Sequence, residues 1–273
     1  MPIQSTFGKV SVFEDFMGLT GAATTISDAT SIRWNDLSLI AVSGDTDINH
    51  TVDEGGGVLS ATGAGGAGDG LAIITAPFIP SAQGTIVVEA RVKNSSATDF
   101  RFFLGWQETV SLTEPVNPYT LNATTLTSNA AGEVVGFYYD SQATTDDFRF
   151  MAGANSAAST AARVRVGPMV AGLNSNATTL GALGIRCGAT LTADRWFIAR
   201  VEIDPNGTAR GYFGDETMAN SRGLSLIATL ESGELSTTAV YYPICQVLAQ
   251  TTGDPTPEVD YFGAVGNRDW DDA

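Results

Sequence analysis

Carboxylate and amide side chains recur at every second residue in the segment 45–49, DTDIN, as they do at the start of an EF-hand calcium loop. Such a loop also needs glycine at its sixth position and a bidentate glutamate at its twelfth. Histidine and glycine stand at those two positions here, so the segment does not complete an EF-hand. Asp45, Asp47 and Asn49 are therefore candidate ligands of a calcium site of another kind, and we expect no other cofactor.

Two other motifs that could carry chemistry do not form a catalytic centre. The segment 63–68, GAGGAG, spells G-x-G-x-x-G, which binds a pyrophosphate only between a strand and the N-terminus of a helix. Asp69 and Gly70 follow it and then a strand, so no nucleotide site is predicted. His50 is the only histidine, without a serine–histidine–acid arrangement or a second ligand for a transition metal. We therefore expect no catalytic residue.

The composition is that of a folded and strongly acidic protein. Hydrophobic residues make up 43% of 273 residues, which is ample for a core, and the net charge of −16 repels phosphate backbones. No stretch approaches the roughly 18 apolar residues of a membrane span, and the N-terminus lacks the apolar segment of a signal peptide. We expect a protein made in the cytosol, with free thiols at Cys187 and Cys245, that binds neither nucleic acid nor membrane.

The clearest secondary-structure pattern predicts a β-hairpin in residues 194–213, DRWFIARVEIDPNGTARGYF. Inward and outward residues alternate up to Ile203, which is the period of a strand. The residues DPNG, from Asp204 to Gly207, then have the sequence of a type I turn that ends in a left-handed glycine. Residues 209–213 return as the partner strand.

Many further short strands are expected. They cover residues 37–42, 71–75, 85–92, 100–106, 133–140, 148–153, 163–166, 185–187, 224–230 and 240–249. Within 100–106, Phe103 lies on the face opposite Phe102 and Leu104, so this strand should be covered on both sides. Residues 53–70 are read as a wide loop or two short hairpins, and 108–132 as an inserted loop. The pattern predicts an all-β sandwich with very little helix and long loops, in one domain over residues 1–273.

Four stretches carry a family resemblance: VSVFEDFMG at 10–18, TIVVEARVK at 85–93, the hairpin, and VDYFGAV at 259–265. They resemble the concanavalin A-like (laminin G-like) jelly-roll domains of tailed-bacteriophage virion proteins. The resemblance implies a jelly roll of two antiparallel sheets in which the closing strand returns beside the first. It also implies a structural protein of the virion, made in the host cytoplasm.

Glucanases of the concanavalin A-like fold raise the question of catalysis. They carry E-x-D-x-x-E on one strand, and its two glutamates act as nucleophile and as acid/base. Glu202 and Asp204 match the first two positions, but Gly207 replaces the second glutamate and lies in the turn. A glycoside hydrolase is therefore the weakest alternative.

The resemblance and the absence of a catalytic motif predict a non-catalytic decoration (cement) protein that stabilises a phage capsid. Its partners would be the major capsid protein and copies of itself in a homo-oligomer. The alternative is a carbohydrate-binding module of a tail fibre or adhesin that stacks aromatic side chains on a surface glycan. Aromatics at strand spacing are more often core or interface residues. The candidate residues for stacking on a glycan are Trp106, Tyr138, Tyr139, Tyr241 and Tyr242.

Both chain ends are expected to contact neighbouring subunits. The N-terminal arm, residues 1–9, is polar or singly apolar, and the C-terminal tail, residues 267–273, carries three acids around Trp270. Neither composition suits the core of its own domain. Met1, Pro2, Ile3 and Trp270 are the candidate interface residues.

Overall fold

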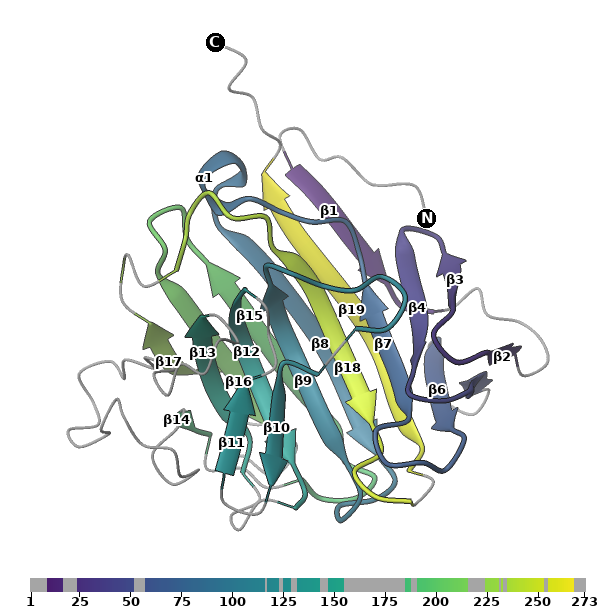
Figure 1. Cartoon of the computed structure of the whole chain (residues 1–273). Coiled ribbons are helices and arrows are strands. Elements are labelled where there is room, and N and C mark those ends of the chain that lie inside the picture. Colours follow the sequence, from purple (N-terminus) through teal and green to yellow (C-terminus); the bar gives the residue numbers. More distant parts are fainter. Residues whose placement is uncertain are drawn as a thin grey trace.

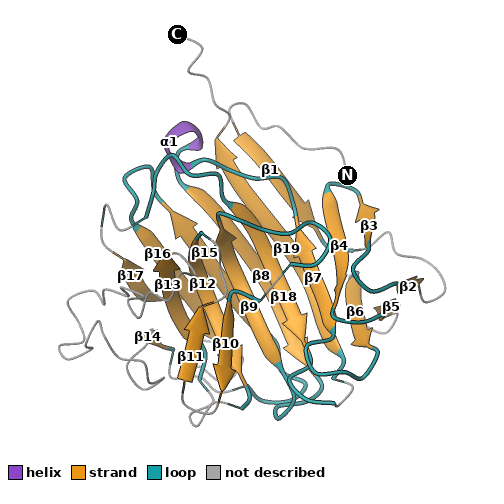
Figure 2. Ribbon diagram, viewed as in Figure 1, coloured by secondary structure: helices purple, strands orange, loops and turns teal. Residues whose placement is uncertain are grey.

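Two β-sheets pack face to face in this protein (Figure 1). The computed structural model describes residues 9–16, 24–51, 57–115, 117–122, 125–128, 132–142, 147–154, 185–187, 191–215, 224–230, 232, 235–252 and 255–267. In these ranges the only helix is the short α1 (Pro80–Gln83), which is far from long enough to cross a membrane (Figure 2).

The first sheet, called sheet A here, has the strand order β17-β16-β15-β8-β19-β6-β5-β2, and β1 pairs with β19 beside this path. Its strands are β1 (Lys9–Glu14), β2 (Thr24–Ile26), β5 (Thr46–Thr51), β6 (Val58–Gly63), β8 (Ile86–Asn94), β15 (Phe197–Ile203), β16 (Ala209–Asp215), β17 (Ser225–Leu230) and β19 (Pro257–Asn267). The closing strand β19 therefore returns beside the opening strand β1, as the resemblance implied.

The second sheet, sheet B, has the order β14-β13-β12-β9-β18-β7-β4-β3. Its strands are β3 (Ser31–Trp34), β4 (Leu37–Val42), β7 (Gly70–Ile74), β9 (Arg101–Gln107), β12 (Glu133–Asp140), β13 (Arg149–Ala154), β14 (Ile185–Arg186) and β18 (Tyr242–Leu248). Neighbouring strands in both sheets run antiparallel, which confirms the predicted sandwich.

The main core lies between the sheets because each strand turns alternate side chains inward. In β8, Ile86, Val88, Ala90 and Val92 are fully buried, and the residues between them are partly exposed. Aromatic rings from both sheets form a cluster between them, with Phe102 of β9 and Phe197 of β15 in an edge-to-face contact at 5.0 Å. Trp106 Nε1 also donates a hydrogen bond of 3.2 Å to the backbone oxygen of Val201, which ties sheet B to sheet A.

A second hydrophobic cluster covers the outer face of sheet B, so the prediction that β9 is covered on both sides is confirmed. Phe103 and Tyr138 of this face pack with Tyr119 and Val110 of the inserted segment. We expected residues 108–132 to be a loop, and that was wrong in part. They contain the hairpin β10 (Tyr119–Asn122) and β11 (Thr125–Ser128), in which Leu121 pairs with Leu126.

Residues 46–51 and 58–63 also form strands, and these two strands pair with each other. We read residues 53–70 as a wide loop or two short hairpins and expected no strand at 46–51. Thr46 and Ile48 of β5 point inward and are buried, and the exposed Asp47 lies between them. Polar outward residues hid this alternation in the sequence. Of the segment 53–70, only residues 64–69 form the described turn between β6 and β7, while residues 53–56 lie outside the described ranges. The strand expected at residues 163–166 also lies outside them.

Candidate functional site

The predicted hairpin is confirmed as β15 and β16. Gly207 has a φ of 79°, and its N–H donates to the Asp204 carbonyl at 2.9 Å. The side chain of Glu202 projects from the outer face of sheet A, where its carboxylate oxygens lie 2.7 Å from Arg200 Nη2 and 3.5 Å from Arg210 Nη1. Arg210 also forms an ion pair with Asp204.

This geometry favours structural ion pairing over acid–base catalysis. Burial tends to raise the pKa of the Asp204 carboxyl, but hydrogen bonds from Arg210 and Thr85 outweigh it and lower that pKa below its usual value. The general acid of a glycosidase needs a raised pKa and a second carboxyl opposite the scissile bond. The turn residue Gly207 provides no carboxyl. Glu202 and Asp204 are thus held as partners of two arginines.

Glu202, Arg200 and Arg210 belong to a larger surface, the outward side chains of β1, β19, β8, β15, β16 and β17, which we call the ladder face, and Asp204 adjoins it. Its ion pairs connect neighbouring strands and include Arg91–Asp260 at 2.6 Å and Lys93–Glu258 at 3.0 Å. Arg91 and Lys93 also lie over the ring of Trp196, at 4.5 and 4.8 Å from its centroid. Such pairs on a half-exposed surface contribute little stability one by one, but together they require one strand register.

One row of directly opposed residues crosses the ladder face from edge to edge. Each residue faces the next across a strand pair: Phe13, Gly263, Glu89, Arg200, Tyr212 and Leu226. The two ends of the row are exposed apolar side chains, with Phe13 54% and Leu226 53% exposed. The centre of the row is charged, with Arg200 Nη1 3.7 Å from Glu89 Oε2.

A hollow of about 180 Å³ opens in this row where Gly263 has no side chain. Phe13 forms one wall and leans over the glycine, since a Cβ at position 263 would lie 3.1 Å from the Phe13 ring. Tyr261 packs beside Phe13, with ring centroids 5.5 Å apart, and Arg200 and Glu89 line the opposite side. The hollow thus combines an aromatic wall with an ion pair.

The phenol of Tyr261 is fixed in this wall. Its hydroxyl donates to Glu89 Oε1 at 2.6 Å. Burial, and after it this hydrogen bond to a carboxylate, raises the pKa of Tyr261 well above its usual value. Tyr261 therefore remains a neutral donor, and Glu89 is held between Tyr261 and Arg200.

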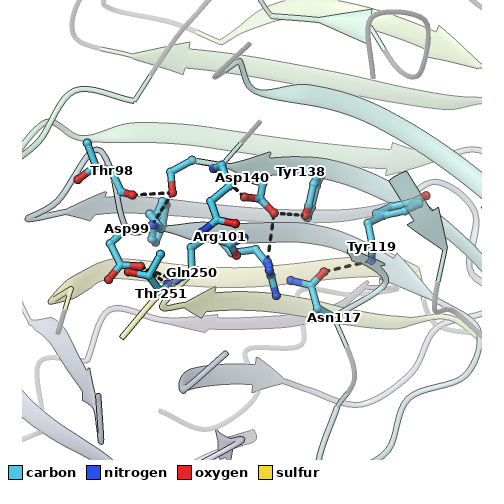
Figure 3. A network of polar contacts seen from close by, with 12 residues as sticks. Thr98, Asp99, Arg101, Asn117, Tyr119, Tyr138, Asp140, Gln250 and Thr251 are labelled. Carbon is cyan, nitrogen blue, oxygen red and sulfur yellow. Dashed lines mark hydrogen bonds and ion pairs between the residues drawn. The ribbon is translucent and has the colours of Figure 1, made fainter. Parts of the chain in front are cut away.

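A second polar cluster lies at one end of sheet B, beside the inserted segment (Figure 3). Asp140 is 1% exposed and accepts hydrogen bonds from Tyr138 Oη at 2.8 Å, Arg101 Nε at 3.3 Å and the Gln142 N–H at 2.9 Å. Burial raises the pKa of Asp140, although these donors partly oppose the shift. The Arg101 guanidinium is thus the counter-ion of the buried Asp140 carboxylate.

Asp99 lies beside this cluster at the entrance to β9. Its Oδ1 accepts the backbone N–H groups of Gln250 at 2.7 Å and Thr251 at 2.5 Å. Asp99 Oδ2 and Gln250 Oε1 are buried and have no hydrogen-bond partner among the described residues. The cluster therefore holds two buried acceptors whose hydrogen-bonding capacity is unused by the described residues.

Asp47 and Asn49 lie in β5 and Asp45 directly precedes it, so the calcium candidates follow a strand and do not surround a loop. Asp45 accepts the Asp28 N–H at 2.8 Å, and Asp47 accepts the hydroxyl of Thr25. No group of three or more His, Cys, Asp and Glu gathers as a metal site within the described ranges. Met1, Pro2, Ile3 and Trp270 lie outside those ranges, so their role as interface residues stays a prediction.

The aromatic residues proposed to stack on a glycan do not form an exposed platform. Trp106, Tyr138, Tyr139 and Tyr241 are at most 1% exposed and belong to the two cores. The exposed aromatic of the ladder face is Phe13, which our sequence analysis did not single out. Its outward position follows from strand alternation, because the neighbouring Val12 points inward.

Comparison with known proteins supports the fold. No protein-family model and no curated protein matches the sequence. Among solved structures, a protein of unknown function from Shewanella oneidensis MR-1 is 12% identical, with a TM-score of 0.52 over 97% of this chain and 90% of that chain. Lectin I from Ulex europaeus, in complex with the methyl glycoside of α-L-fucose, is 10% identical, with a TM-score of 0.50 over 95% and 98%. The CBM2 module of the evolved Dit of Lactobacillus casei BL23 phage J-1 is 10% identical, with a TM-score of 0.49 over 96% and 98%.

The likenesses to the Shewanella protein and to lectin I, together with the two antiparallel sheets, define the class of the fold. It is a concanavalin A-like, legume-lectin-like jelly roll, as the sequence predicted. Its structural neighbours include lectins and carbohydrate-recognition domains.

Proposed function

We propose that this chain is a non-catalytic structural protein of a tailed-phage virion, displayed on the capsid as a decoration protein. One observation carries the proposal. The stretches that resemble phage virion domains fall on β1, β8, β15, β16 and β19, which are contiguous in sheet A in the order β16-β15-β8-β19-β1. Stretches far apart in the sequence therefore build one surface, the ladder face.

The chemistry of that surface supports binding without catalysis. The carboxylates Glu202 and Asp204 are engaged by Arg200 and Arg210, and no second glutamate completes the pair that retaining hydrolysis requires. A surface of cross-linked strands with an aromatic hollow is instead suited to holding a partner.

Mass spectrometry of purified virions tests the proposal by giving the copy number of this chain relative to the major capsid protein. Hundreds of copies are expected for a decoration protein, whereas a handful would assign it to the tail. A complementary assay adds the purified protein to capsids that lack it and measures binding by co-sedimentation and particle melting. Absence from virions and from capsids in both assays would refute the proposal.

A second candidate function is carbohydrate binding, because structural neighbours of this fold include the Emp47p carbohydrate recognition domain and a lectin. Asp99 and Gln250, whose unpaired oxygens are buried, would have to open to a ligand to accept its hydroxyl groups. Lectin I of Ulex europaeus, which has this fold, was solved with a methyl fucoside. A glycan array with the wild type and Asp99→Ala tests this function. A glycan bound by the wild type and lost in Asp99→Ala would support it, and no binding to any glycan would remove it.

A further inference from the structure

The turn between β15 and β16 contains a chemically reactive pair of residues. Asn206 and Gly207 form the one Asn-Gly dipeptide in the sequence. An asparagine carboxamide can be attacked by the backbone nitrogen of the next residue, and glycine leaves that nitrogen unobstructed because it has no Cβ. Asn206 is exposed, so its carboxamide is accessible to solvent.

The side chain of Asn206 is folded over the nitrogen that would attack it. Its Oδ1 accepts the Thr208 N–H at 3.0 Å. The ring that this hydrogen bond closes contains both Asn206 Cγ and the Gly207 nitrogen, so the two reacting atoms belong to one turn. When the nitrogen adds to Cγ, negative charge develops on Oδ1. The Thr208 N–H already donates to that oxygen and stabilises the charge.

Ser232 stabilises the charge on the attacking group. A peptide nitrogen attacks as its anion, and the negative charge is shared with the carbonyl oxygen of the same peptide. Ser232 Oγ donates a hydrogen bond of 2.9 Å to this oxygen, the Asn206 carbonyl. A hydrogen bond to the charged form of a group favours its ionisation, so the contact makes the Gly207 N–H more acidic. Ser232 is 26 residues from Asn206, so only the folded chain provides the contact.

One interaction in the turn opposes the reaction. The Gly207 N–H donates to the Asp204 carbonyl at 2.9 Å, and this bond must open before the nitrogen can lose its proton. The turn lies at the end of the hairpin, where local opening costs less free energy than it does in the strands. The contact of Ser232 with the Asn206 carbonyl is separate from this bond.

We propose that Asn206 deamidates spontaneously in the folded protein, with Ser232 as a positioning residue. Hydroxide takes the proton from the Gly207 nitrogen, which bonds to Asn206 Cγ, and the carboxamide nitrogen leaves as ammonia with a proton from water. Water then opens the cyclic imide at Cγ to give aspartate, or at the backbone carbonyl carbon to give isoaspartate. No atom is oxidised or reduced. This inference does not depend on the capsid role.

The products should weaken the turn. Both add a carboxylate close to Asp204, and isoaspartate also adds a carbon atom to the backbone. Two hydrogen bonds close the present turn, from the Gly207 N–H to the Asp204 carbonyl and from the Asp204 N–H to the Thr208 carbonyl at 2.8 Å. The longer backbone does not fit both, so the isoaspartate form should melt at a lower temperature than the unmodified protein.

Peptide mapping of the folded protein during prolonged incubation at pH 8 tests the proposal. Trypsin releases residues 201–210, VEIDPNGTAR, and chromatography with mass spectrometry separates the asparagine, aspartate and isoaspartate forms. Asn94, which precedes Ser95 and is fully buried, is the internal control and should stay unmodified. Asn206→Gln should give no product at this position, because its longer side chain must close a larger ring.

Ser232→Ala separates the structural contribution from the reactivity of the dipeptide. It should slow deamidation of the folded protein about threefold or more, the effect of one hydrogen bond of ordinary strength. In urea the variant and the wild type should react equally. Ser31→Ala, which removes an exposed serine from β3, is the matched control and should leave the rate unchanged. Melting curves establish that each variant is folded.

Three results would overturn the proposal. The first is a folded wild type that stays unmodified at Asn206 while the protein in urea reacts. The second is a folded Ser232→Ala variant that reacts as fast as the wild type or faster. The third is an equal slowing by Ser31→Ala, which would show that the effect of Ser232 does not come from its hydrogen bond to the Asn206 carbonyl.

Discussion

The buried ion pair of Arg101 and Asp140 gives a sharp test of the polar cluster in sheet B. Replacing Arg101 by Met leaves a carboxylate that is 1% exposed without its cation. Breaking a buried pair from one side costs about 3–5 kcal/mol. Tyr138 and the Gln142 N–H still donate to Asp140. We therefore expect Arg101→Met to lower the free energy of unfolding by about 2–3 kcal/mol at pH 7.5.

The loss should depend on pH, because the folded-state pKa of Asp140 is already raised by burial. Without Arg101 this pKa rises further, and the folded protein then binds the Asp140 proton more tightly than the unfolded chain does. Stability is consequently gained as the pH falls through the folded-state pKa of the variant and lost as it rises. The difference between wild type and Arg101→Met should be smaller at pH 5 than at pH 7.5.

Urea unfolding at both pH values measures this difference. Asp140→Asn in the Arg101→Met background removes the charge and should recover at least about 1 kcal/mol at pH 7.5. Arg91→Met is the matched control, since the Arg91–Asp260 pair is 35% and 23% exposed, and it should cost less than about 1 kcal/mol. An equal loss for Arg101→Met at both pH values, with no recovery by Asp140→Asn, would refute the reasoning.

Three further predictions concern the hairpin, the core and the thiols. Gly207→Val should lower the unfolding free energy by about 1–3 kcal/mol because φ is positive at this position. Gly207→Asn should cost less, because asparagine tolerates positive φ. Equal melting temperatures for the two variants would show that the turn does not require a left-handed residue at position 207. Trp106→Phe should cost about 2 kcal/mol through the lost volume and the lost bond to the Val201 carbonyl, and an unchanged urea midpoint would show that this bond is unimportant. Burial raises the pKa of the Cys187 and Cys245 thiols, so a thiol reagent at pH 8 should label them only in urea, and fast labelling of the folded protein would contradict their burial.

Strand alternation made most of the sandwich predictable from sequence. In β8 and β15 every inward residue except Asn94, the last residue of β8, is apolar, and most outward residues are charged or polar, so the pattern fixes both the strand and its buried face. The turn between β15 and β16 was predictable because proline and glycine each favour one backbone conformation there. These signals are local, and they suffice to predict a strand that has one solvent-facing and one buried face.

The elements that were missed have weaker local signals. The hairpin of β10 and β11 is rich in threonine and asparagine, and its position over the outer face of sheet B depends on packing with Phe103 and Tyr138. The hollow over Gly263 was also invisible, because a glycine in a strand signals close packing as often as a cavity. It requires the register that sets Gly263 opposite Phe13 and Glu89, and these pairings join residues far apart in the sequence, which local patterns do not reveal.

The register also brings together two of the short sequence patterns noted above. V-E-A-R-V-K supplies Glu89, and R-V-E-I-D supplies Arg200, which lies directly opposite on the neighbouring strand. A slip of β15 by one residue against β8 would turn Arg200 into the core and expose the apolar side of β15. Each exposed ion pair contributes little stability. The ladder of pairs therefore acts mainly by excluding wrong registers, and it leaves an ordered surface on which a partner can bind.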